Sequence, residues 1–587
     1  MNTFSRFKEH IATLKKTTNK ALHAFSPIER FGFILSITVA FVTLFIILFH
    51  INSEFLVSIP AKGGTLREGV VGTPRFVNPL LAVTDTDKDL TKLVYRGLMR
   101  KNSEGEIVPD IATNYTVSDD GLTYTFTLGE AYFSDNKKVT VDDILFTVKS
   151  AQDATLKSNM RVAWSGVIAK GIDENTVSFT LKQAYAPFLE TTTIGILPKH
   201  LWEKVPYEAW VYSQLNTSKA VGAGLYEISS IDENSSSIPV SYTLKASNIK
   251  KAPNTLIETI VIHFYSSEAT LLSAYKNGTI DALGGIDPKD AVTLEGSAHI
   301  SYHPLPRVFG LFFNQNTTKI FTESAVRKAI SFGINKSEIV ENVLHGYGKI
   351  IDSPVPKEND HAEENKEIEN REENIKTAKN LLEKAGWKMG ADGIYAKRMT
   401  KKDKEDTRLS FEIATNDVPE LKQTVEMIST SLKEIGIEAI PKVYETGSLN
   451  QDIIRPRKFQ ALFFGEVVTN QSNLYAFWHS SQRNDPGLNI SGYANTKTDK
   501  ALESSLSVLD QDKLESIYES FEKELKADMP AVFVYSPMYL YVTRPNADGI
   551  VLEKITSPED RFSQIRDWYL ATDRVWRIFA KQGVIEN

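Results

Sequence analysis

The sequence predicts an α/β protein that follows one membrane-spanning helix. Three observations support this fold class. Residues 31–51 form an uninterrupted apolar run. Two short segments alternate apolar and polar residues with the period of a half-buried strand, and two amphipathic helices each end at a glycine, the second just before a strand-like segment. A length of 587 residues is enough for roughly three or four domain-sized units, so we expect a large folded body beyond the membrane segment.

The strand-like segments have clear boundaries. Residues 122–128 place Leu, Tyr, Phe and Leu at period two after an Asp-Asp-Gly turn. Residues 177–181 repeat the pattern after an Asp-Glu-Asn turn, and residues 65–70 open the folded region with a further strand-like start. We expect strands at all three places.

The helical segments carry capping signals. Residues 142–148 begin with two aspartates, which are favourable in the first turn of a helix. Apolar residues recur at helical spacing from Ile375 to Ala385 and stop at Gly386, and a second helix over 425–435 ends at Gly436 before the strand-like residues 437–440. Residues 357–373 hold eight acidic and three basic side chains, which predicts a solvated loop; a cation-binding loop is the alternative.

The apolar run of residues 31–51 has the length to span a bilayer, because 21 helical residues extend about 31 Å. Six basic and two acidic residues precede it, so the positive-inside rule keeps the N-terminus in the cytoplasm and places the rest of the chain outside. A cleaved signal peptide is the competing interpretation. Its apolar region is usually 7–15 residues long and ends at small residues, whereas residues 53–60 offer no such site. We therefore favour an uncleaved anchor.

Composition excludes several classes of function. The balance of 67 basic and 74 acidic residues, a formal charge of -7 and a pI near 5.9 give no footprint for nucleic acid. The chain has no cysteine, so disulfides, thiolate metal sites, a cysteine nucleophile and lipid attachment through cysteine are all excluded.

Enzyme signatures are also absent. The sequence contains no zinc-protease, serine-hydrolase, P-loop or dinucleotide-binding motif, and Gly222-Ala223-Gly224 lacks the third glycine of the last. Residues 134–137 satisfy two motifs of penicillin-recognising enzymes at once, but those motifs belong to separate converging segments, so a turn is the better interpretation. The ten histidines are scattered. We expect no enzyme activity, no metal and no cofactor.

A series of short blocks resembles the extracellular solute-binding proteins of family 5, the oligopeptide- and dipeptide-binding proteins of ABC transporters. The resemblance covers residues 62–570, and its strength lies in the shared order of the blocks. These are residues 76–80, 93–98, 109–112, 117–126, 133–136, 139–143, 186–188, 196–200, 221–226, 313–314, 325–330 and 381–387.

The resemblance implies a two-lobed, periplasmic-binding-protein-like clamshell of type II with an extra domain in lobe one. By this comparison the chain divides into a cytoplasmic tail, a membrane anchor, a tether, lobe one with the additional domain, lobe two and a C-terminal return to lobe one, with crossovers near residues 304–307 and 529–530. The corresponding ranges are 1–30, 31–51, 52–64, 62–305, 306–529 and 530–587.

The resemblance also implies a ligand site in which a peptide is held as an added strand. One ligand-pairing segment falls on Val83, Thr84 and Asp85, and the other on Phe464, Gly465, Glu466 and Val467; Gly465 would allow close approach of the ligand backbone. Asn314 and Gly224 are further ligand-binding candidates. Trp164, Trp478 and Tyr493 are candidates for pocket walls, with packing in the core as the equal alternative.

One position departs from the family pattern. Many peptide binders carry an aspartate four residues after the glycine that corresponds to Gly465, to pair with the peptide ammonium, and this chain has Thr469 there. Glu466 or Asp85 are the possible substitutes. Together with the apolar run of residues 31–51, the resemblance implies a membrane-anchored, extracytoplasmic receptor that delivers peptides to ABC permease subunits. The alternatives are another solute, such as a sugar or a nickel complex, and a ligand sensor, which the short cytoplasmic tail disfavours.

Overall fold

The computed structural model describes residues 25–576 except 251–253, 356–369, 401–403, 546, 548 and 553. Three predictions fall partly outside these ranges: residues 1–24 of the cytoplasmic tail, residues 357–369 of the acidic loop and residues 577–587 of the C-terminal return. The chain divides into two compact units, one formed by the residues up to Lys62 together with those from Ala571 onward, and the other by Gly63–Leu570.

The first unit contains the apolar helix. Helix α2 (Pro27–Phe55) starts with a capping box between Ser26 and Glu29 and includes the whole apolar run, so it has the length and composition to cross a membrane. Strand β1 (Leu56–Ala61) follows at once and pairs antiparallel with β23 (Ala571–Trp576). Most of the predicted tether therefore continues the helix or forms a strand.

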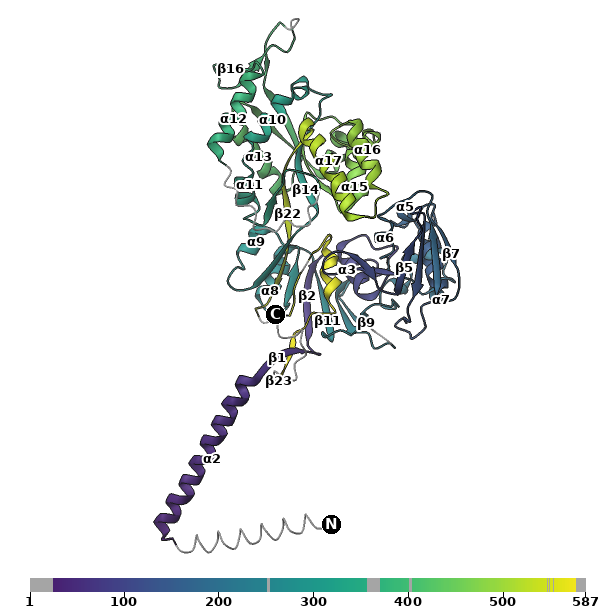
Figure 1. Cartoon of the computed structure of the whole chain (residues 1–587), viewed down its shortest axis with the longest axis vertical. Coiled ribbons are helices and arrows are strands. Elements are labelled where there is room, and N and C mark those ends of the chain that lie inside the picture. The colour runs from purple at the N-terminus through teal and green to yellow at the C-terminus, as the bar shows by residue number, and fades with distance from the viewer. Residues whose placement is uncertain are drawn as a thin grey trace. The chain divides into compact units, whose positions relative to one another are not determined.

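The second unit is a two-lobed α/β body built on one long mixed sheet, in the order β20-β19-β21-β14-β22-β12-β2-β11-β10-β9, with β13 and β15 also paired to β22 (Figure 1). Lobe one contributes β2 (Thr65–Val71), β9 (Tyr226–Glu233), β10 (Pro239–Ala246), β11 (Thr259–Tyr265), β12 (Ala282–Gly284) and β13 (His299–Pro304), with helices α3 (Asp85–Val94), α8 (Glu268–Lys276) and α9 (Pro288–Val292) and the 3-10 helix η7 (Pro558–Gln564).

The additional domain is inserted between β2 and β9. Its sheet has the order β5-β6-β8-β7. Its elements are β3 (Met99–Lys101), β4 (Ile107–Pro109), β5 (Ala112–Val117), β6 (Thr123–Leu128), β7 (Ile168–Gly171), β8 (Thr176–Thr180), α4 (Val141–Gln152), α5 (Arg161–Trp164), α6 (Phe188–Thr191), α7 (Lys199–Trp202), η1 (Tyr207–Tyr212) and η2 (Gln214–Asn216).

Lobe two has a parallel β20-β19-β21 portion with helices packed on it. Its strands are β14 (Arg307–Phe313), β15 (Gly348–Ile350), β16 (Lys388–Met389), β17 (Tyr395–Lys397), β18 (Thr407–Arg408), β19 (Ser410–Asn416), β20 (Glu438–Tyr444) and β21 (Ala461–Val467). Its helices are η3 (Lys319–Thr322), α10 (Ser324–Gly333), α11 (Lys336–Val343), α12 (Arg371–Lys384), α13 (Pro419–Glu434), α14 (Thr446–Ser448), η5 (Leu449–Ile454), α15 (Gln471–Trp478), η6 (Ser480–Gln482), α16 (Thr496–Ser505) and α17 (Gln511–Asp528).

The local sequence signals correspond to observed elements. The expected strands are β2, β6 and β8, and the expected helix at residues 142–148 is α4. Gly386 and Gly436 follow α12 and α13 with φ of 88° and 79°, the left-handed conformation that a glycine adopts freely after a helix. Strand β20 (Glu438–Tyr444) then includes residues 438–440 of the segment predicted as a strand after Gly436.

The chain crosses between the lobes twice. The first crossing is the turn between β13, which ends at Pro304, and β14, which begins at Arg307. The second lies inside β22 (Ala531–Thr543), because residues 531–535 pair with β14 and residues 538–543 pair with β13. It therefore falls a few residues after the predicted Pro530. Hydrogen bonds tie the crossings together: Ser536 Oγ donates to Leu305 O (2.6 Å), and Leu305 N donates to Pro537 O (3.0 Å). This pair of segments has the construction of a hinge.

Each lobe has its own hydrophobic core. Buried residues between 66 and 305 cluster with residues 539–568, and those between 308 and 535 form two further clusters in lobe two. A smaller cluster joins α8 and α9 to β22. The hydrophobic cores thus change over at the same two places where the chain crosses.

Candidate ligand-binding site

The lobe-one segment of the predicted site is exposed, and a buried carboxylate fixes its backbone. Val83 is 65% exposed, and Thr84 caps α3. The buried carboxylate of Asp87 accepts hydrogen bonds from the N–H groups of Arg75, Phe76, Val83 and Thr84, at 2.6–3.3 Å. A carboxylate with four backbone donors fixes a loop firmly, so residues 83–85 are presented on a preorganised turn.

A second set of side chains holds the approach to this segment. Ser158 Oγ donates to Leu80 O and Asn159 Nδ2 donates to Ala82 O, both at 2.8 Å. Both donors come from the additional domain. The position of the Val83 turn therefore depends on that domain as well as on α3.

The lobe-two segment is a strand with one free edge. Strand β21 pairs with β14 along its whole length, from Ala461 to Val467. On its other side β19 pairs only with Ala461 and Leu462, and the Thr415 hydroxyl bonds to Phe463 O. Among the described residues, the edge from Phe464 to Val467 has no strand partner. An extended ligand can pair with such an edge.

The ladder determines which backbone groups face this edge. Asn314 N donates to Gln460 O and Val468 N donates to Pro306 O, so Gln460 and Val468 direct their backbone groups toward β14. Such orientation alternates along an antiparallel strand. Gly465 and Val467 therefore direct their N–H and C=O groups toward the free edge, and Phe464 and Glu466 do not.

The packing of β21 against β14 itself requires a glycine at position 465. A Cβ at this position would lie 2.6 Å from the ring of Phe309, its partner on β14. The ring occupies the space above the glycine. The packing of Phe309 is thus sufficient to explain the absence of a side chain, and the approach of a ligand backbone stays a prediction.

Glu466, Trp478 and Tyr493 come together, but inside lobe two. Glu466 is 1% exposed, and the rings of Trp478 and Tyr493 lie 6.4 Å apart. Among the residues that the structure describes, neither carboxyl oxygen of Glu466 has a hydrogen-bond partner, and Trp478 Nε1 also lacks one. Burial raises the pKa of Glu466 well above its usual range, and the neighbouring Trp478 side chain offsets part of this. Their contacts are those of core residues, so we do not carry them into the proposed site.

Trp164, Gly224 and Asn314 are placed elsewhere. Trp164 is buried against Phe179 and Phe188 in the additional domain. Gly224 packs on the last residues of α3, where a Cβ would lie 2.3 Å from Leu93 O. Asn314 is buried at the opposite end of the β14–β21 pair from Val467, and its amide donates to Arg457 O. Packing accounts for all three, and we leave them out of the proposed site.

Thr469, the departure from the family pattern, is engaged by its own helix cap. Its N–H and hydroxyl both donate to Asn473 Oδ1, at 3.0 and 2.8 Å. Of the two possible substitute carboxylates, Glu466 is buried, whereas the Asp85 side chain is 65% exposed. Asp85 is therefore the one of the two that a ligand ammonium can reach.

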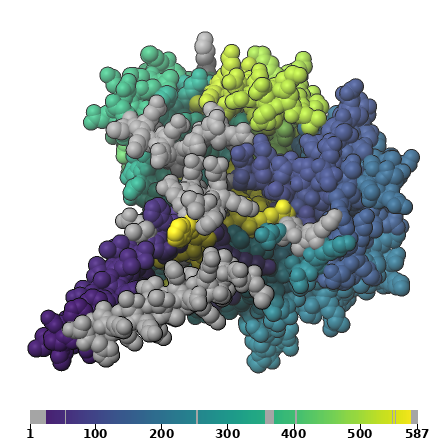
Figure 2. Space-filling model, turned by 60° about the horizontal axis from the view of Figure 1, so that its bottom comes forward, coloured from purple at the N-terminus to yellow at the C-terminus, as the bar shows by residue number. Residues whose placement is uncertain are grey.

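Sequence reasoning missed a set of contacts between the additional domain and lobe two. Asn470 Nδ2 donates to Glu190 Oε2 (2.7 Å), Ala186 N donates to Leu506 O (2.8 Å), and the Tyr185 and Ser472 hydroxyls bond to each other. In Figure 2 the yellow-green surface of lobe two adjoins the blue surface of the additional domain. We call these three contacts the inter-lobe latch. No local sequence pattern predicts this latch, because its partners come from distant segments.

Glu190 is also tied to lobe one. Its Oε1 lies 3.0 Å from Lys101 Nζ, and Lys101 also lies 3.6 Å from Asp560. The latch carboxylate is thus oriented by a cation on its own lobe.

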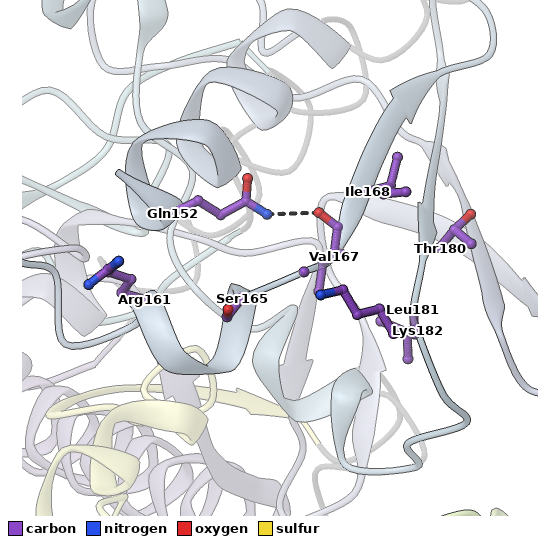
Figure 3. A pocket seen from close by; sticks show the side chains of 9 residues that line it. Gln152, Arg161, Ser165, Val167, Ile168, Thr180, Leu181 and Lys182 are labelled. Carbon is purple, nitrogen blue, oxygen red and sulfur yellow. Dashed lines mark hydrogen bonds between the residues drawn. The ribbon is translucent and has the colours of Figure 1, made fainter. Parts of the chain in front are cut away.

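A cavity lies in the additional domain, apart from residues 83–85 and 464–467. Its volume is about 530 Å³, and Figure 3 shows Arg161 and Lys182 at its border and Gln152 Nε2 donating to Val167 O (2.7 Å). Among the described residues, the oxygens of Glu268, Asp287 and Asp290 lie close enough to share a metal ion. Glu268 already accepts a hydrogen bond from Asp287 N, and acidic side chains alone do not identify a cation.

Two lobes joined at a double crossing, with a fixed turn on one lobe and a free strand edge on the other, define a solute-binding protein of the clamshell type. Residues 106–485 match the bacterial extracellular solute-binding proteins, family 5, and the chain belongs to that family. The family consists of extracytoplasmic transport proteins that bind solutes and are not enzymes.

Individual relatives bind different solutes. The oligopeptide-binding protein AppA of Bacillus subtilis is 24% identical over 523 residues, which cover 87% of this chain and 92% of AppA. Its structure with a nonapeptide has a TM-score of 0.60 at 23% identity, covering 87% of this chain and 100% of that one. NikZ of Campylobacter jejuni, in complex with Ni(L-His), has a TM-score of 0.64 at 22% identity, covering 86% and 99%.

Proposed function

We propose that this protein is a membrane-anchored extracytoplasmic receptor that captures peptides between its lobes and delivers them to the permease subunits of an ABC importer. The observation that carries this proposal is the free edge of β21, where Gly465 and Val467 direct their backbone groups outward. A peptide supplies matching N–H and C=O groups at regular spacing along its whole length. A compact solute has no such regular series of N–H and C=O groups.

Val83, Thr84 and Asp85 form the opposing half of the proposed site. All three residues are exposed, and the Asp85 carboxylate is a partner for the ligand ammonium. In this proposal the neutral Thr469 contributes no charge, so Asp85 has the role that an aspartate beside the strand has in other peptide binders.

Closure follows from the hinge and the latch. A ligand that contacts both lobes favours the state in which they approach, because only a difference in affinity between two states can shift their populations. We propose lobe one over residues 62–305 with a return after residue 530, and lobe two over 306–529. The permease would recognise the closed form.

The anchor is the part of the proposal that concerns location. Helix α2 is long and apolar enough to cross a membrane, and its basic flank favours a cytoplasmic N-terminus. A single-pass protein remains in the membrane fraction until detergent is added. Recovery of a soluble form with a new N-terminus near Lys62 would show that the helix is a cleaved signal instead.

Native mass spectrometry of the detergent-solubilised full chain, followed by denaturation and identification of the released molecules, tests the ligand class. We expect a set of peptides that differ in sequence and share one length. A single non-peptide mass, or an empty protein that binds nothing from a peptide library, would contradict the peptide proposal and leave the fold unchanged.

A further inference from the structure

The last described strand returns to the outer end of the membrane helix. Strand β23 pairs with β1 in the register Leu56↔Trp576 to Ala61↔Ala571. Since β1 directly follows α2, the antiparallel pairing makes β23 run back toward the helix and ends it with Trp576 beside the last helical turn. Residues at the two ends of the chain thus meet at one point.

The Trp576 side chain is bonded to that helical turn. Its Nε1 donates to Asn52 Oδ1 (2.8 Å), and its ring lies 6.3 Å from the ring of Phe55. Even so, Trp576 is 45% exposed and Phe55 is 55% exposed. Two neighbouring aromatic rings therefore remain uncovered by the described chain.

Trp576 is unlike the other tryptophans of this protein. The remaining six, Trp164, Trp202, Trp210, Trp387, Trp478 and Trp568, are all less than 2% exposed. The seventh, Trp576, is exposed, and it lies in the two-stranded ribbon that β1 and β23 form beside the apolar helix. Tryptophan is enriched at membrane–water interfaces, where its ring meets the acyl chains and its N–H meets the polar zone.

The height of the two rings fits that zone. The apolar run ends at Ile51, so Asn52 and Phe55 lie one and four residues beyond it, or about 1.5 and 6 Å along a helix. The headgroup layer on each side of the hydrocarbon is roughly 5–8 Å thick. If residues 31–51 span the hydrocarbon, Phe55 and the indole that packs on it lie among the headgroups.

We propose that Trp576 and Phe55 form an interfacial anchor in the outer headgroup layer, so that the C-terminal strand, as well as the N-terminal helix, holds the protein to the bilayer. This inference rests on the proposed membrane anchoring. Its ligand is the interface of a phospholipid bilayer, and the ribbon β1–β23 ties the two attachments together.

The test uses the full chain in phosphatidylcholine vesicles whose acyl chains carry bromine close to the headgroup, a contact quencher of tryptophan fluorescence. We expect quenching in the native protein and its loss in Trp576→Phe, because the other six tryptophans are shielded in folded cores. Trp576→Phe combined with Phe41→Trp reports separately whether the helix is inserted; because residue 41 lies at the centre of the apolar run, this variant is measured in matched vesicles whose lipids carry bromine near the ends of the acyl chains.

The outcomes are distinguishable. Quenching of Trp576 together with the Phe41→Trp reporter supports the inference. Quenching of the reporter alone overturns the interfacial anchor and leaves the membrane helix intact, whereas quenching of neither overturns both. If Trp576 stays open to aqueous acrylamide until permease subunits are added, the surface is a protein contact and the inference is also overturned.

Discussion

Asn470 and Glu190 join the two lobes through one hydrogen bond, from Nδ2 to Oε2 at 2.7 Å. Asn470 also caps α15 through its side-chain oxygen, which accepts from Ser472 N. Glu190 is oriented by Lys101. The bond therefore connects two groups that are each fixed on their own lobe, so it costs little side-chain entropy to form.

Replacing Glu190 by Ala removes this bond from the state in which the lobes touch. We expect the apparent dissociation constant for a co-purified ligand to rise about fivefold, or about 1 kcal/mol, as for one partly exposed charge-assisted hydrogen bond. Titration calorimetry measures the affinity, and the radius of gyration from X-ray scattering without ligand should increase.

Glu174→Ala, an exposed glutamate in the same domain, is the matched control and should change neither quantity. Unaltered affinity and scattering in Glu190→Ala would mean that the latch does not contribute to closure.

Val467→Pro tests the free edge of β21. Proline removes the outward N–H of Val467 but no hydrogen bond to β14, and it is tolerated on a strand edge. We expect ligand binding to weaken two- to tenfold, which is the effect of about one backbone hydrogen bond, with the melting temperature nearly unchanged. Val467→Ala keeps the N–H and should bind within about twofold of the native protein. Equal affinities of Val467→Pro and Val467→Ala would exclude pairing at this N–H.

Glu466→Gln tests whether this acid serves the core or the ligand. Burial raises the folded-state pKa of Glu466, so the native state holds its proton more tightly than the unfolded state. Below the ordinary carboxyl pKa, the acid is protonated in both states and costs no stability. As the pH rises from there toward the folded-state pKa, only the unfolded state gains from ionisation, so the free energy of unfolding falls. Glutamine never ionises.

We therefore expect Glu466→Gln to raise the free energy of unfolding at pH 8 and to change it little at pH 4, measured by denaturant titration. Each unit of pKa shift corresponds to about 1.4 kcal/mol. Glu412→Gln, on the neighbouring strand β19 and exposed, is the control. A loss of ligand affinity without the gain in stability would instead assign Glu466 to the ligand.

Arg561→Met tests the ion cluster that holds the return segment to lobe one. Arg561 is 3% exposed, and its guanidinium bonds Glu68 at 2.7 Å and both oxygens of Asp89 at 2.6 Å. Removing it leaves two buried carboxylates without a cation, which costs about 3–5 kcal/mol.

We expect a large fall in the melting temperature, measured by circular dichroism. Asp89 lies on α3, whose first turn carries Asp85, so ligand affinity should fall as well. Arg398→Met breaks an exposed pair with Asp406 and should cost less than 1 kcal/mol. Similar effects of the two variants would show that the buried cluster is not important for stability.

Local signals in the sequence predicted the elements well. The 21-residue apolar run, the period-two strand at residues 122–128 and the capped helix at residue 142 each depend on neighbours within one or two turns of chain, and the glycines after α12 and α13 depend only on backbone conformation. The order of short blocks identified the family for the same reason, since each block is a short local segment.

Only the tertiary structure decided which partners these elements found. Periodicity shows which positions of a segment are apolar, but it does not show what will cover them. The ring of Phe309 therefore fills the space beside Gly465, and the core of lobe two receives Glu466 from the predicted strand and Trp478 from α15. The latch from Glu190 to Asn470 spans 280 positions, and the bond from Trp576 to Asn52 spans 524. Such contacts form only when the packing of whole lobes brings distant segments together, so no window of sequence contains them.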